Sequence, residues 1–430
     1  MKLTLKNIGK IGDASVEING ITVIAGENNT GKSTVGRALF AVFNSFFNIQ
    51  KQIQNERAEI IEDTLDRMYI NTSRRTFRFI ANTNVVAETI ASNPEKYRSM
   101  NSSMLKDKIF ELLEQNSGEN VQLAGEKEVE EPIAHLSEIL NISDSTFLES
   151  VLEKKLSAEF NDQVCNIFSE DSGEIQLWIK NDCINVNIDD EGTVNIQNPA
   201  NLSLHTETIY IDDPFVIDDP NIFLHRNPRF FSNKYLNHQE HLKTKLFYLK
   251  SDGNVFEEIL IRDKLDSIYD KLLSVCSGNV VRDKRAGFGY KKEGSDKVLN
   301  VRNLSTGLKT FVILKTLIEN GTIESNGTII LDEPEIHLHP EWQLLFAEII
   351  VLIQKEFGIH ILMNTHSPYF LNAIEVYSAK YGIDDKCKYY LSSSQDGIGF
   401  INDVTNNIEA IYSKLARPLQ DLENEGGRLC

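Results

Sequence analysis

Apolar and polar positions alternate near the start of the chain in a way that predicts strands followed by a helix. Leu3, Leu5 and Ile8 alternate with polar residues, and the wholly apolar run ITVIAG at 21–26 is typical of a buried strand. A glycine-containing loop follows, and STVGRALFAVFNSFF then places apolar residues at helical spacing. Residues 1–45 are therefore predicted to form strands, a loop and a helix in that order.

The second half of the chain repeats this alternation of buried strands and helices. Apolar strands are predicted at TETIYIDDP (206–214), NGTIILDEP (326–334) and HILMNT (360–365), and helices at 305–320 and 340–357. A mostly helical stretch at 221–280 and a hairpin before residue 303 are predicted to form a subdomain at 221–303. A last strand pair turns at 395–397, and a helix closes the chain at 405–423. Strands that alternate with helices indicate an α/β fold with a mixed central sheet flanked by helices.

Residues 46–204 interrupt this pattern and are predicted to form a large α+β insertion. Helical patterns lie near 50–70, 104–115 and 134–160. EIQLWIK, CINVNI and TVNIQN then predict an antiparallel meander. The predicted head domain is thus 1–45 and 205–430. No heptad pattern persists, so a long coiled coil is not expected.

The loop after the first buried strand carries a phosphate-binding pattern. GENNTGKS, from Gly26 to Ser33, fits G-x-x-x-x-G-K-[ST], in which backbone N–H groups surround phosphate oxygens at a helix N-terminus. Lys32 would reach the β- and γ-phosphates, and the Ser33 hydroxyl would ligate Mg²⁺. The predicted ATP-binding residues of this loop are Asn28, Asn29, Thr30, Gly31, Lys32, Ser33 and Thr34.

A second strand, TIILDEP, ends in two carboxylates. Asp332 would hold Mg²⁺ through water or through Ser33, and Glu333 would orient and deprotonate the attacking water. Alone, this pattern also fits an acidic turn after a core strand. Together with the phosphate-binding loop, it favours nucleotide hydrolysis.

The segment LSTGLK, from Leu304 to Lys309, resembles the LSGGQ signature of ABC-type ATPase heads. In that family the signature contacts the γ-phosphate held by an opposing subunit. The resemblance implies that Ser305 supplies a hydroxyl and that Gly307 allows close backbone approach. The alternative is a serine that caps an ordinary helix. Thr306 and Leu308 depart from the signature in a way that points away from transporters.

Three further positions follow from this resemblance. His366, in NTHSP, matches the switch histidine that senses the γ-phosphate, and Glu335–Pro340 matches the loop at the seam between two heads. The expected glutamine after a core strand is missing. Asp212 either replaces it as a ligand of Mg²⁺ or water, or that loop lies elsewhere. His337 and His339 lack a third ligand nearby, so a metal site there is not expected.

Charge and cysteine content narrow the class of protein. Sixty-three acidic against 44 basic residues give a net charge of −19, which argues against a small dedicated DNA-binding module. The five cysteines are scattered, so no disulfide framework is predicted. No signal peptide and no run of about 18 apolar residues is present, and a cytoplasmic protein without a membrane span is predicted.

The resemblance covers roughly 1–45 and 205–405, and it is strongest to split SMC/RecF-like heads, including those of the OLD, Septu and PARIS anti-phage group. Such a head implies ATP and Mg²⁺ as cofactors, a homodimer or higher oligomer, and a separate nuclease effector. The 64 residues after His366 are too few for the Toprim nuclease of OLD chains. Two alternatives stay open: a RecF-like DNA repair clamp that uses the basic segments at 226–245 and 282–292, and a binding module whose ATPase activity is slow or lost.

Overall fold

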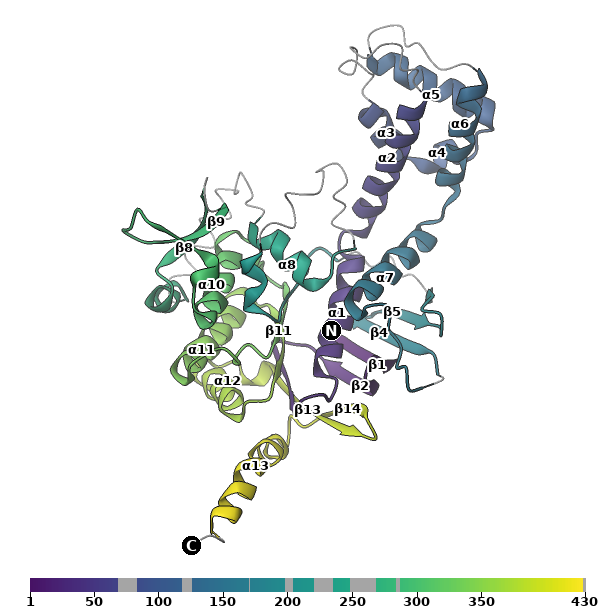
Figure 1. The fold of residues 1–430 in the computed structure, drawn as a ribbon. Helices are drawn as coiled ribbons and strands as arrows, with labels where there is room; N and C mark the ends of the chain where they lie inside the picture. Colours follow the sequence, from purple (N-terminus) through teal and green to yellow (C-terminus); the bar gives the residue numbers. More distant parts are fainter. Residues whose placement is uncertain are drawn as a thin grey trace. The chain divides into compact units, whose positions relative to one another are not determined.

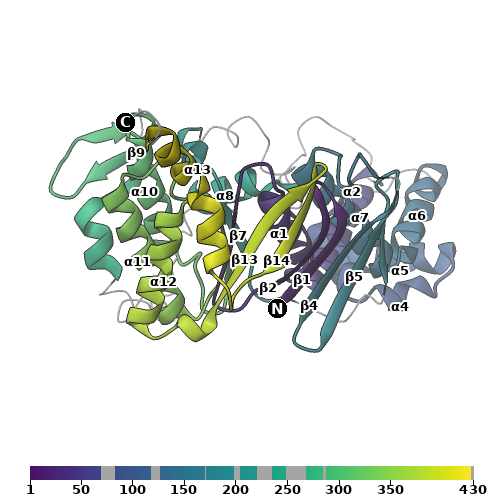
Figure 2. The ribbon, with the colours of Figure 1, turned by 90° about the horizontal axis from the view of Figure 1, so that it is seen from below.

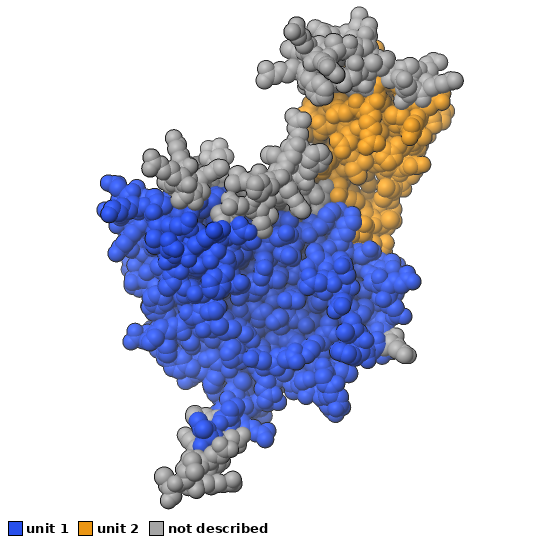
Figure 3. All heavy atoms as spheres, in the orientation of Figure 1, with its two compact units in different colours: residues 1–47, 151–430 blue, residues 48–150 orange. Residues whose placement is uncertain are grey.

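The computed structural model describes residues 1–68, 83–117, 126–169, 171–197, 204–219, 235–247, 268–283 and 287–427. The chain divides into two compact units, residues 1–47 with 151–430 and residues 48–150 (Figure 3). The first unit carries every motif identified above. The basic positions Arg226, Arg229, Lys234, Lys284 and Arg285, part of the possible DNA-binding segments, lie outside the described residues.

The second unit, residues 48–150, is helical. It contains α2 (Ile49–Arg67), α3 (Thr83–Ser92), α4 (Pro94–Arg98), α5 (Ser102–Ser117), α6 (Glu126–Asn141) and the start of α7 (Asp144–Phe160). Buried residues at helical spacing, such as Ile61, Leu65 and Leu136, form a core that is separate from that of the first unit. The helical patterns predicted for this part of the sequence are confirmed.

An eleven-stranded sheet organises the first unit, in the order β6-β5-β4-β1-β2-β14-β13-β3-β12-β11-β7. Its strands are β1 (Lys2–Ile8), β2 (Ile11–Glu17), β3 (Ile21–Gly26), β4 (Gly173–Ile179), β5 (Asp182–Ile188), β6 (Val194–Gln197), β7 (Thr208–Ile211), β11 (Thr328–Asp332), β12 (His360–Thr365), β13 (Cys387–Gln395) and β14 (Ile398–Asp403). β13, β3, β12, β11 and β7 run parallel to one another. The predicted α/β class with a mixed central sheet is confirmed.

Helices cover both faces of these parallel strands. On one face, α10 (Thr306–Glu319), α11 (Pro340–Phe357) and α12 (Pro368–Tyr381) lie beside them, and their aromatic residues share a core with Val23, Ile329 and Met363 (Figure 2). On the other face lies α1 (Lys32–Phe46). A Cβ on Gly36 would come within 3.0 Å of Ile330 and 3.1 Å of Tyr210, so glycine lets α1 approach the sheet closely.

Smaller elements complete the first unit. They are the helices α8 (His238–Phe247) and α13 (Glu409–Gly427), a helix at 268–275, and a three-stranded sheet of β8 (Gly278–Asp283), β9 (Gly287–Lys292) and β10 (Val298–Asn300). β9 and β10 form the hairpin predicted before α10. Within the described part of the chain, no helix is both long enough and apolar enough to cross a membrane.

The structure corrects the predicted boundary of the insertion at residue 204. The meander β4-β5-β6 extends the head sheet, because β4 pairs antiparallel with β1 and aligns Trp178 with Lys2 (Figure 1). The residues of the meander therefore belong to the head, and the separate helical unit ends at Ser150. The alternating pattern predicted these strands correctly. It could not identify β1 as their partner, because that pairing joins positions about 170 residues apart in sequence.

Candidate nucleotide-binding site

The motif residues come together because four neighbouring parallel strands end at the same edge of the sheet. β3 leads into the phosphate-binding loop, β12 into His366, β11 into Asp332 and Glu333, and β7 into Asp212. The order β3-β12-β11-β7 places these chain segments side by side. Binding sites in parallel α/β sheets form at this carboxyl edge.

The phosphate-binding loop has the backbone geometry that its sequence predicts. Gly31 has a φ of 89°, and a Cβ there would lie 2.5 Å from Ile11, so the turn requires glycine. α1 starts directly after it with no acidic residue in its first turn. Asn28 and Asn29 are exposed, Ser33 and Thr34 are half-buried, and the Thr30 hydroxyl lies 2.7 Å from that of Ser392.

Lys32 is 4% exposed and its Nζ donates to the carbonyl oxygens of Gly26 and Glu27, at 3.1 and 2.7 Å. Burial lowers the pKa of this ammonium, while the nearby carboxylates of Glu333 and Asp332 oppose that effect. The bonds to Gly26 and Glu27 hold the ammonium inside the loop, where the motif predicts a lysine that would bind phosphate.

Asp332 is held on both sides by neutral donors. Tyr210 donates its hydroxyl to Oδ2 at 2.8 Å, and the Asn364 side chain donates to Oδ1 at 2.9 Å. Both partners are buried, and burial raises the pKa of Tyr210 well above its ordinary value, so the hydroxyl stays a donor. These two bonds fix the direction in which the carboxylate faces.

Tyr210→Phe should therefore lower turnover about tenfold, since it leaves one Asp332 oxygen without a donor. It should also raise the Mg²⁺ concentration that gives half-maximal turnover. The matched control is Tyr390→Phe, which removes an equally buried hydroxyl that instead accepts from the Glu17 backbone at 2.8 Å. Equal Mg²⁺ dependence in the two variants would show that Tyr210 does not orient Asp332.

Glu333 occupies a strained backbone position between the other motifs. Its φ is 50°, in the left-handed region that non-glycine residues rarely adopt. Its Oε1 lies 3.7 Å from Lys32 Nζ and 3.5 Å from His366 Nδ1. The strain is thus located where one carboxylate faces both the phosphate-binding loop and the predicted switch histidine.

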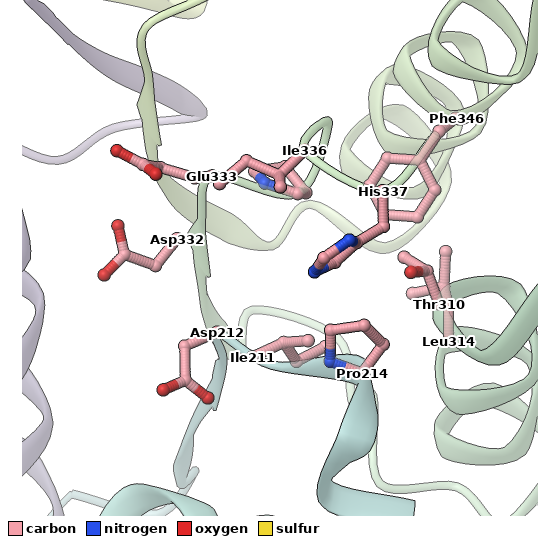
Figure 4. A pocket seen from close by; sticks show the side chains of 11 residues that line it. Ile211, Asp212, Pro214, Thr310, Leu314, Asp332, Glu333, Ile336, His337 and Phe346 are labelled. Carbon is pink, nitrogen blue, oxygen red and sulfur yellow. The ribbon is translucent and has the colours of Figure 1, made fainter. Parts of the chain in front are cut away.

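Asp212 points to the same side as Asp332 and Glu333 (Figure 4). Its Oδ2 accepts from His238 at 2.8 Å and from Gln239 at 2.9 Å, while Oδ1 is buried without a bond among the described residues. Burial opposes ionisation, but these bonds hold the pKa of Asp212 below its ordinary value. One oxygen of an ionised carboxylate is thus left for another ligand.

His238 connects Asp212 to Glu159 on α7. Its Nδ1 lies 2.7 Å from the fully buried Glu159, and its ring stacks on Tyr210 at 4.3 Å. Burial would lower the pKa of His238, but the two carboxylates outweigh it and raise the pKa to about 9. The imidazolium thus supports Asp212 through a bond and Asp332 through Tyr210.

The predicted signature residues lie at the start of α10. Ser305 is exposed and is the N-cap residue, yet its side chain makes no capping bond. Gly307 is buried, and a Cβ there would lie 3.0 Å from the His337 carbonyl and 3.1 Å from Trp342. The glycine is thus needed for packing within this chain against the 335–340 loop, a reason that the motif alone does not reveal.

The arrangement fits a nucleoside triphosphate with Mg²⁺. A buried ammonium, a helix N-terminus and a Cβ-free turn surround the space where phosphates would bind, and oriented carboxylates face it. Two buried atoms, His366 Nδ1 and Asp212 Oδ1, make no hydrogen bond among the described residues. Sequence reasoning missed Tyr210, His238 and Asn364. Only Asn364 gave a signal, as a polar residue inside an apolar strand.

Comparisons with known proteins agree with this site. Residues 21–372 match the family described as "AAA domain, putative AbiEii toxin, Type IV TA system". Two relatives are each 28% identical: a retron Vc95 probable ATPase of Vibrio cholerae, over 29% of this chain, and a retron Ec83 probable ATPase of Escherichia coli, over 32%. Each match spans 26% of the relative's length, about a quarter.

Two solved structures also resemble the chain. They are an SMC head domain from Thermotoga maritima (11% identity, 94% and 98% coverage of this chain and that one, TM-score 0.38) and an Smc head from Pyrococcus furiosus (11%, 98% and 98%, 0.40). At these TM-scores the likeness adds nothing to the strand order and motif positions described above. The family match, in contrast, spans most of the head and every nucleotide motif. The chain therefore belongs to this family of AAA-domain proteins.

Proposed function

We propose that this chain binds and hydrolyses ATP with Mg²⁺ in a site that two heads complete together. The observation that carries the proposal is the position of Glu333, whose Oε1 lies within 3.7 Å of Lys32 and 3.5 Å of His366. A carboxylate between a phosphate-binding ammonium and a histidine is suited to activate water beside a terminal phosphate.

Each residue has a distinct part in this reaction. Lys32 and the N-terminus of α1 would bind phosphate oxygens, and Ser33, Asp332 and the free Asp212 oxygen would hold Mg²⁺ or its water. When bound there, the ion would neutralise charge on the phosphates. Glu333 accepts the proton of the attacking water, whose oxygen bonds to the γ-phosphorus as the bond to ADP breaks, and His366 contacts the γ-phosphate.

The exposed Ser305 supports completion of the site by a second head. Its hydroxyl makes no capping bond in its own chain, so it remains available to a phosphate on another molecule. Gly307 packs on the 335–340 loop that follows Glu333. A contact between Ser305 and the partner's phosphate would thus be transmitted to Glu333 through Gly307 and this loop.

We further propose that the paired heads gate or scaffold a separate effector, a nuclease, in anti-phage defence. The support is the family description and the retron ATPases among the relatives. The RecF-like alternative has less support. Five basic residues of its two segments lie outside the described residues, and one described member, Lys245, is paired with Glu207 at 2.5 Å.

The test uses the purified full chain. ATP turnover that requires Mg²⁺, together with an ATP-dependent shift from one to two chains by light scattering, is the expected result. Pull-down with the product of the neighbouring reading frame tests the effector. Salt-dependent binding of bare DNA by the chain alone would instead favour the clamp, and a lack of turnover would reject the proposed activity.

A further inference from the structure

Glu335 lies just past the catalytic carboxylates, in a loop expected to face a second head, yet its side chain turns inward. It is 3% exposed, whereas its neighbour Ile336 is 51% exposed. Burial raises the pKa of the Glu335 carboxyl. A carboxyl group is costly to bury, so its contacts indicate why it is there.

One oxygen of Glu335 binds the loop that carries His366. Oε1 accepts from the Thr365 hydroxyl and from the His366 backbone N–H, the latter at 3.2 Å. The Thr365 hydroxyl in turn accepts from the Ser367 backbone at 3.1 Å. The end of β12 and the two residues before α12 are thereby tied to a single oxygen from the loop after β11, Ser367 through the Thr365 hydroxyl.

The imidazole of His366 lies beside this attachment. Its Nδ1 is 3.5 Å from Glu333 Oε1 and 3.9 Å from Glu335 Oε1, and it makes no hydrogen bond to any described residue. The His366 side chain is therefore held through its backbone, while its ring stays available. Oε2 of Glu335 is likewise buried without a bond within the described ranges.

We propose that Glu335 is a positioning residue: it anchors the 365–367 loop so that the His366 ring faces Glu333 and the terminal phosphate. The inference rests on the proposed function for its effect on turnover, but the anchor itself exists without nucleotide. Glu335 acts through hydrogen-bond acceptance, so a side chain that accepts the same two bonds should replace it.

Amide hydrogen exchange tests the anchor directly in the nucleotide-free protein. In ¹⁵N-histidine-labelled chain, nine histidines give a small set of signals, and His366→Ala identifies the one that belongs to His366. Glu335→Ala should speed exchange at His366 about tenfold, and Glu335→Gln should leave it slow. Unchanged exchange in Glu335→Ala would overturn the inference, whether or not the chain hydrolyses ATP.

Turnover then tests what the anchor does. Glu335→Ala should lower kcat about a hundredfold with little change in KM, matching His366→Ala, and the double variant should fall no further. Glu335→Gln should stay near wild type. Additive losses, or a Gln variant as poor as Ala, would overturn the positioning role while leaving wild-type turnover, and hence the proposed function, intact.

A matched control separates anchoring from a general loss of stability. Glu348 on α11 is 6% exposed and accepts from Lys271 and Lys380 at 2.6 and 2.8 Å. Glu348→Ala should alter neither His366 exchange nor kcat. If it slowed turnover as much as Glu335→Ala does, the effect would reflect burial of any carboxylate, and the inference would be wrong.

Discussion

Glu333→Gln is expected to lower ATP turnover about a thousandfold while ATP still binds. Glutamine keeps the shape of glutamate and can contact Lys32 and His366, but its amide cannot accept the proton of the attacking water. Because ATP then persists in the site, the paired state should last longer. Single-turnover hydrolysis and light scattering with ATP measure the two effects separately.

The control for Glu333→Gln is Glu341→Gln, which neutralises an exposed carboxylate in the first turn of α11. It should leave both turnover and pairing at the wild-type level. Unchanged hydrolysis in Glu333→Gln would show that Glu333 does not accept the proton, because glutamine cannot accept it.

Ser305→Arg is the second change with a large expected effect: hydrolysis and ATP-driven pairing should both be lost. Ser305 is exposed and makes no side-chain cap, so the substitution should cost the folded monomer little. In a paired state, however, the bulky guanidinium would occupy the space of the partner's γ-phosphate. Binding of a fluorescent ATP analogue to the single chain should persist.

The corresponding control is Ser99→Arg, which places the same side chain on an exposed position of the 48–150 unit. It should hydrolyse ATP like wild type. If Ser305→Arg retained turnover, each head would work alone, and the exposed N-cap of α10 would be an ordinary helix start.

Local patterns in the sequence predicted most of the head. Alternation gave the strands, helical spacing gave the helices, and the phosphate-binding loop was identified because Gly31 and Lys32 stand at fixed positions in it. Pairing between distant strands could not be predicted in this way. The β4–β1 ladder joins Trp178 to Lys2, and nothing in either strand specifies the other.

The candidate site shows the same division. Lys32, Asp332, Glu333 and His366 are brought together as their motifs predict. Tyr210 was not predicted as a site residue, and Glu335 was predicted only as part of the loop at the seam, because their importance lies in partners from other segments, Asp332 and the 365–367 loop. A buried hydrogen bond depends on tertiary structure, and a residue's type alone does not indicate which distant atom it meets.

Mixing two inactive variants tests the shared site most directly. Lys32→Ala cannot bind phosphate, and Ser305→Arg cannot complete a partner's site, so each alone should be inactive. Neither variant should pair with itself, so the pairs that form in an equal mixture are mixed, and each holds one intact site of two; up to about half of wild-type turnover should therefore return. A mixture as inactive as its components would contradict a site built from two heads.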